Sequence, residues 1–101
     1  MQDPIRIADL KKFDPAVWLD SPEAIAAYLS DILAADDAAL LAVALGDIAR
    51  ARGMTEMARA TGLTREALYK ALRPGASPRF DTIRRVCRAA GVRLVAEPMV
   101  S

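Results

Sequence analysis

The feature that most constrains this fold is a pair of short helical segments separated by three residues around Gly62. Glycine can end the first segment because its backbone takes left-handed conformations at little steric cost. Thr55 and Thr64 are each placed to cap one segment through a side-chain oxygen. Ala58, four positions before the glycine, is small enough to let two helices cross closely. The apolar side chains that would fix the crossing angle are Met57, Leu63 and Leu68. This segment predicts a helix-turn-helix.

Residues that cap or break helices mark further elements on both sides of this motif. Ser21, Pro22 and Glu23 predict the start of a first helix, with an N-cap, an N1 proline and a favourable negative charge. Asp36 and Asp37 end it and can cap a second helix, which stops at Gly53. A further helix follows Pro78 and is closed by Gly91. Gly46 falls inside the second helix, either as a site of close packing or as an irregularity.

Two short stretches of alternating apolar residues predict terminal strands, at residues 5–7 and 92–97. With 101 residues, the chain is expected to form one mainly α-helical domain of five helices with one or two such strands. We divide it into an N-terminal arm (1–20), an acidic helical hairpin (21–52), the helix-turn-helix with its closing helix (53–91) and the terminal strand (92–97). The candidate residues for pairing with a second subunit or a partner are Val92, Leu94 and Val95.

The composition excludes most catalytic chemistry. The chain has no histidine and a single cysteine, Cys87, which excludes histidine-based catalysis, disulfides within the chain and cysteine-histidine zinc sites. We therefore expect no enzyme activity, no metal and no cofactor. The absence of a leader-like N-terminus or a long apolar run predicts a cytoplasmic protein without a membrane partner.

Charge is divided unequally along the chain. Residues 1–49 hold three basic and nine acidic groups, a net charge of −6, whereas residues 50–101 hold eleven basic and four acidic groups, a net charge of +7. Clustered arginine and lysine gain free energy when they release counterions from a phosphate backbone. The basic half is therefore a candidate nucleic-acid-binding half, although the two halves could also simply neutralise each other.

Several side chains on and beside the second helix of the motif can reach DNA bases or phosphates. The candidate DNA-binding residues are Thr55, Thr64, Arg65, Glu66, Tyr69, Lys70, Arg73 and Arg79. Ordinary structural roles compete with this interpretation: Glu66 and Lys70 have the spacing of a surface ion pair, and the arginines can be merely solvated. Outside the motif, we expect a solvated face at Arg84, Arg85 and Arg88, a buried inert thiol at Cys87, and lids over the core at Phe13 and Trp18.

The motif and the segment from Pro78 to Val92 resemble the Xre/phage-repressor type of helix-turn-helix. More broadly, residues 13–23, 44–53 and 68–72 are similar to the HigA-like addiction-module antidote proteins. The resemblance implies that Thr64, Arg65, Glu66 and Lys70 occupy base-reading positions, whereas Tyr69 and Arg73 contact phosphates. The first helix of the motif is one residue shorter at its start than in most Xre repressors, so that Thr55 stands in for the usual phosphate contact. Thr61 replaces an apolar residue of the pattern, so its hydroxyl must bond back to its own helix or reach solvent.

The resemblance further implies an antitoxin that neutralises a small basic toxin of the RelE/ParE type and represses its own operon by binding operator DNA as a homodimer. The acidic first half is then the expected toxin surface. Two other functions remain open at this point: a stand-alone Xre-family transcriptional regulator without a toxin partner, and a protein-interaction module whose helix-turn-helix has lost DNA binding.

Overall fold

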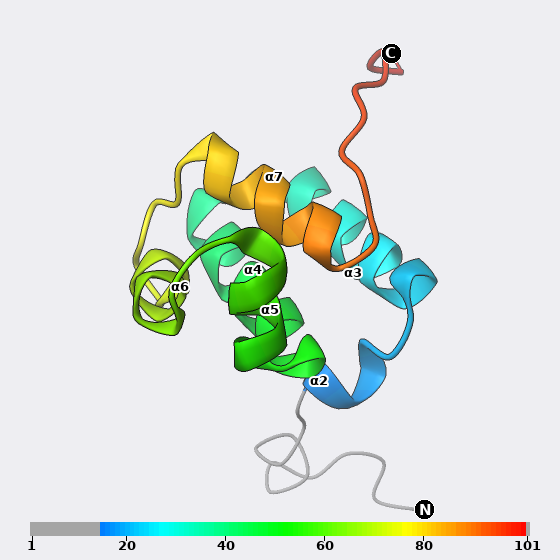
Figure 1. Cartoon of the computed structure of the whole chain (residues 1–101). Helices are drawn as coiled ribbons and strands as arrows, with labels where there is room; N and C mark the ends of the chain where they lie inside the picture. Colours follow the sequence, from blue (N-terminus) through cyan, green and yellow to red (C-terminus); the bar gives the residue numbers. More distant parts are fainter. Residues whose placement is uncertain (1–14, 101) are drawn as a thin grey trace, which may run out of the picture.

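The computed structural model describes residues 15–100, which form a mainly helical domain (Figure 1). A four-residue turn of helix, α2, is followed by five helices of eight residues or more. Their bounds are α2 Pro15–Trp18, α3 Pro22–Ala34, α4 Ala38–Arg52, α5 Met54–Thr61, α6 Arg65–Leu72 and α7 Phe80–Ala89. The mainly α-helical prediction with five helices is confirmed within this part of the chain.

The first two long helices begin at the predicted caps. Ser21 Oγ accepts a hydrogen bond from the Ala24 backbone N–H at 3.1 Å, with Pro22 in the first turn. Asp37 Oδ1 accepts from the Ala39 N–H at 3.0 Å and so caps α4. Each cap satisfies a backbone donor that the first turn of a helix leaves without a partner.

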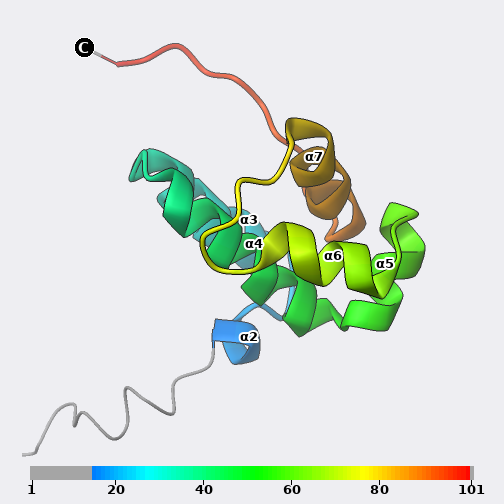
Figure 2. The same ribbon diagram turned by 90° about the vertical axis from the view of Figure 1, so that its left-hand side faces the viewer.

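Helix α4 is the centre of the fold, because it packs against α2, α3, α5, α6 and α7. Its residues 44–49 are all buried, and Leu45 and Ile48 are fully enclosed. At Gly46, an added Cβ would lie 3.2 Å from the carbonyl oxygen of Leu72, the last residue of α6. Gly46 is therefore a site of close packing, which places α6 directly on α4 (Figure 2).

The two ends of the fold differ from the sequence-based expectation. Residues 92–100 run out beyond α7 and, like the rest of the described chain, contain no strand. A strand needs a neighbour to take its backbone hydrogen bonds, and the partner expected within the chain, residues 5–7, lies outside the described residues, as does Phe13. Trp18, expected as a lid over the core, is 63% exposed, and the adjacent Leu19 is buried.

No helix within residues 15–100 combines the length and the apolar character that crossing a membrane requires.

Candidate nucleic-acid interface

Helices α5 and α6 form the predicted pair of short helices three residues apart. Gly62 ends α5 in a left-handed conformation, with φ of 78°, and donates its N–H to the Ala58 carbonyl at 3.0 Å. Thr64 Oγ1 then caps α6 by accepting a hydrogen bond from the Ala67 N–H at 3.0 Å. The other predicted cap is wrong: Thr55 lies inside the first turn of α5, because α5 starts at Met54, directly after Gly53, and has no side-chain cap.

The buried hydroxyl group of Thr61 forms hydrogen bonds to residues on both sides of the turn. Thr61 is 5% exposed, and its Oγ1 donates to the Met57 carbonyl oxygen at 2.7 Å. The same oxygen accepts a hydrogen bond from the Leu63 N–H at 3.3 Å, on the far side of the turn. The expected back-bonding is thus confirmed, and it lets a polar side chain occupy a buried position.

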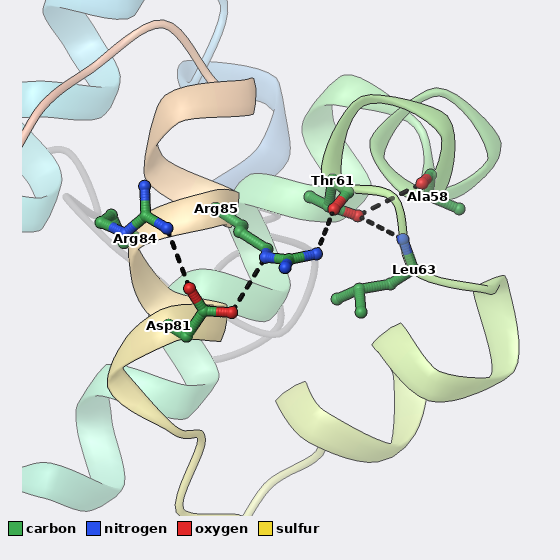
Figure 3. A network of polar contacts seen from close by, with 6 residues as sticks. All are labelled: Ala58, Thr61, Leu63, Asp81, Arg84 and Arg85. Carbon is green, nitrogen blue, oxygen red and sulfur yellow. Dashed lines mark hydrogen bonds and ion pairs between the residues drawn. The ribbon is translucent and has the colours of Figure 1, made fainter.

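Helix α7 holds the same turn from outside through Arg85 (Figure 3). Arg85 Nη1 donates to the Thr61 carbonyl oxygen at 3.0 Å, and its Nε lies 2.9 Å from Asp81 Oδ2. Arg84 Nη2 bonds the other carboxylate oxygen of Asp81 at 2.9 Å. This hydrogen bond, helped by the two positive charges, holds the pKa of the Asp81 carboxyl below its ordinary value. Arg84 and Arg88 are exposed, as expected for a solvated face, whereas for Arg85 that expectation is incomplete because its guanidinium also bonds the Thr61 carbonyl.

All eight predicted DNA-binding residues are exposed, but they do not form a single group. Those that line one surface depression along α6 and at its ends are Thr64, Glu66, Tyr69, Lys70 and Arg73. Arg65 belongs to the same helix, where its guanidinium lies 5.9 Å from the centre of the Tyr69 ring. We call these six residues the α6 face. Thr55 on α5 and Arg79 just before α7 lie on other elements.

The surface ion pair considered for α6 does not form: among the ion pairs within residues 15–100, none joins Glu66 to Lys70. Arg65 instead contacts Tyr69, one turn further along, with its Nη2 3.5 Å from the phenol oxygen. The charged ends of Glu66 and Lys70 are thus left exposed on the α6 face.

Sequence reasoning missed a buried polar cluster around Asp47 of α4. Asp47 is 5% exposed, and its Oδ2 accepts a hydrogen bond from Tyr28 Oη of α3 at 2.8 Å. Its Oδ1 pairs with Arg50, one turn along α4. Burial, the hydrogen bond and the negative charge of Asp47 together raise the pKa of Tyr28 to about 12, against a smaller opposing effect of Arg50. An acidic residue inside the apolar run from Ala44 to Ala49 was the available signal, because buried carboxylates are normally paired.

The described residues contain no group of three or more histidine, cysteine, aspartate or glutamate side chains placed to hold a metal ion. Cys87 is 1% exposed, and burial raises the pKa of its thiol, which confirms the prediction of a buried thiol. The α6 face presents charged, hydrogen-bonding and aromatic side chains, which suit binding to a polyanion.

Comparison with known proteins gives two matches. The family model described as "Probable addiction module antidote protein" matches residues 9–98. An uncharacterized protein of Haemophilus influenzae is 48% identical over 84 residues, which cover 83% of this chain and 87% of the relative. No solved structure matches this chain significantly.

Proposed function

This chain belongs to the family of probable addiction module antidote proteins, and from this premise we propose that it is a DNA-binding antitoxin that represses its own operon. Family membership supports the antitoxin role and a toxin partner in general. The further content of the proposal is that the toxin is a small basic protein of the RelE/ParE type, and that a HigA-like helix-turn-helix of the Xre type binds operator DNA.

The observation that carries the DNA-binding part is the exposure of the α6 face on a helix that is fixed from three sides. Its N-terminus is capped by Thr64, its last residue, Leu72, packs closely on α4 at Gly46, and the turn before it is bonded by Arg85. The major groove of DNA is about 12 Å wide and admits one α-helix. A helix with basic, acidic and aromatic side chains on its open face can therefore read bases while its own position stays fixed.

The roles proposed for individual side chains follow from their donor and acceptor groups. Arg65 and Lys70 can donate to the O6 and N7 acceptors of guanine, and Glu66 can accept from the amino group of cytosine. The residues proposed to contact the sugar-phosphate backbone are Thr55, Tyr69, Arg73 and Arg79. A homodimer would place two such helices about 34 Å apart on one side of the duplex. For its interface we propose the C-terminal segment, in which Val95 is exposed and Val92 and Leu94 are partly buried against the core.

The toxin is proposed to bind the acidic hairpin of α3 and α4. Its exposed carboxylates are Glu23, Asp31, Asp36 and Asp37, and Asp20 lies just before it. Opposite charges speed association of a basic partner and lose effect as salt screens them. Binding of the toxin should therefore weaken between about 50 and 200 mM salt, whereas an affinity independent of salt would remove this electrostatic role.

One experiment tests both halves of the proposal. The tagged protein is captured from its source cells with nuclease treatment, the eluate is identified by mass spectrometry, and the purified chain is then titrated with the DNA upstream of its gene. A stoichiometric small basic protein together with specific DNA binding is the expected result. Retained DNA binding without such a protein would leave the stand-alone regulator. A stoichiometric partner without DNA binding would leave a protein-interaction module.

A further inference from the structure

A second basic site adjoins the α6 face, at the junction between the last turns of α4 and α6. A pocket of about 160 Å³ there is lined by Arg50 of α4 together with Tyr69 and Arg73 of the α6 face. Arg50 is absent from the predicted contacts, because its place on the central helix gives no sequence signal of exposure. The fold nevertheless brings it beside two of the side chains already proposed to contact DNA.

The Arg50 guanidinium pairs with a buried carboxylate on one side and is exposed to solvent on the other. One nitrogen, Nη2, pairs with Asp47, whose side chain is only 7% exposed, whereas the Arg50 side chain is 54% exposed. The other carboxylate oxygen of Asp47 accepts a hydrogen bond from Tyr28 Oη at 2.8 Å, so both oxygens have partners. A guanidinium has five N–H donors in a rigid fork, and donors remain for a ligand on the exposed side. Asp47, Arg50 and Arg73 together leave one positive charge at this site.

We propose that Arg50 is a further contact to a DNA phosphate, positioned by Asp47 and Tyr28, which extends the interface from α6 onto α4. The inference rests on the proposed function, because it concerns the same duplex. Phosphate is the ligand whose oxygens match the arginine fork, and a duplex seated on α6 places its backbone beside the groove that the helix enters. A donor already held by a buried carboxylate loses less freedom on binding than a mobile arginine does.

The test compares the wild type with Arg50→Gln, because glutamine keeps a polar partner for Asp47 Oδ1, whereas alanine would leave that buried carboxylate oxygen without one. Binding to the upstream duplex and to a scrambled duplex is measured by fluorescence anisotropy from about 50 to 200 mM salt. We expect about ten-fold weaker binding to both duplexes and a salt slope reduced by about 1. Arg88→Gln on α7 is the matched control, since Arg88 is exposed and lines another pocket but not this one, and it should retain the wild-type values.

The variant Tyr28→Phe distinguishes the positioning of Arg50 by Asp47 and Tyr28 from the contact that Arg50 itself makes with phosphate. This variant keeps every charge but removes the hydrogen bond to Asp47, so the affinity should fall while the salt slope stays that of the wild type. Binding by Arg50→Gln with wild-type affinity and slope would overturn the inference and leave the proposed function intact. If the wild type binds neither duplex, the proposed DNA-binding function fails and this inference fails with it.

Discussion

Arg85 donates from Nη1 to the carbonyl oxygen of Thr61 at 3.0 Å and so joins α7 to the last residue of α5. Carbonyl groups in the last turn of a helix have no partner within it, so this acceptor would otherwise depend on water. Asp81 fixes the other edge of the same guanidinium, at 2.9 Å from Nε. The closing helix thus takes part in setting the direction in which the chain leaves the turn toward α6.

Replacing Arg85 with alanine should lower the free energy of unfolding by about 1 kcal/mol, because a charged hydrogen bond is lost at a site that solvent partly screens. Chemical denaturation measures this change. Arg88→Ala on the same helix is the control, since the Arg88 side chain is exposed and forms no hydrogen bond or ion pair with another described residue, and it should change stability by less than about 0.5 kcal/mol. Equal effects of the two substitutions would contradict a specific role for the Thr61 bond.

The buried hydroxyl of Thr61 gives a second test of the turn. Thr61→Val keeps the shape of the side chain but leaves the Leu63 N–H without its acceptor, at 3.3 Å in the wild type. We expect a loss of about 1 to 2 kcal/mol in the free energy of unfolding. Thr61→Ser retains the hydroxyl and should recover most of that loss. A valine variant as stable as the wild type would show that the hydroxyl contributes nothing.

The helix boundaries could be predicted where the physical cause is local. Ser21, Asp37 and Thr64 each accept a hydrogen bond from a backbone N–H two or three residues further on, so the sequence alone contains both partners. Thr55 has the same chemistry but does not cap, because Gly53 ends α4 and begins α5 with no room for a separate cap. The correct side chain is therefore not sufficient when two helices share one junction.

The polar contacts that position the candidate interface could not be predicted in the same way. Arg85 reaches an acceptor 24 residues away, and Tyr28 a carboxylate 19 residues away, so both bonds depend on the packing of whole helices. Exposure of the α6 face followed from helical periodicity once the cap was placed. The base-reading and phosphate-binding roles on that face remain predictions, since they depend on a ligand.

Ionisation of the Tyr28 phenol should lower the free energy of unfolding at high pH. Its pKa rises from the ordinary value of 10.0 to about 12, so the folded chain holds the phenol proton more tightly than the unfolded chain does. The stabilisation is complete below about pH 10 and is lost as the pH rises toward 12. Chemical denaturation at several pH values in this interval should therefore show the difference in free energy of unfolding between the wild type and Tyr28→Phe, which lacks the titrating group, shrinking as the pH rises. A constant difference between the two proteins would contradict the raised pKa.

Substitutions on the α6 face should separate base reading from backbone binding. Arg65→Ala and Lys70→Ala each remove a donor proposed for guanine, so binding to the upstream duplex should weaken by about 1 to 3 kcal/mol, with a smaller loss on a scrambled duplex. Arg73→Ala removes a proposed phosphate contact and should weaken binding to both duplexes alike, with a salt slope smaller by about 1. Arg88→Ala, on the exposed side of α7, is the control. Because Arg65 also contacts Tyr69, its substitution frees that ring, so Lys70→Ala gives the cleaner comparison. Unchanged specificity in both variants would place base recognition on a surface other than α6.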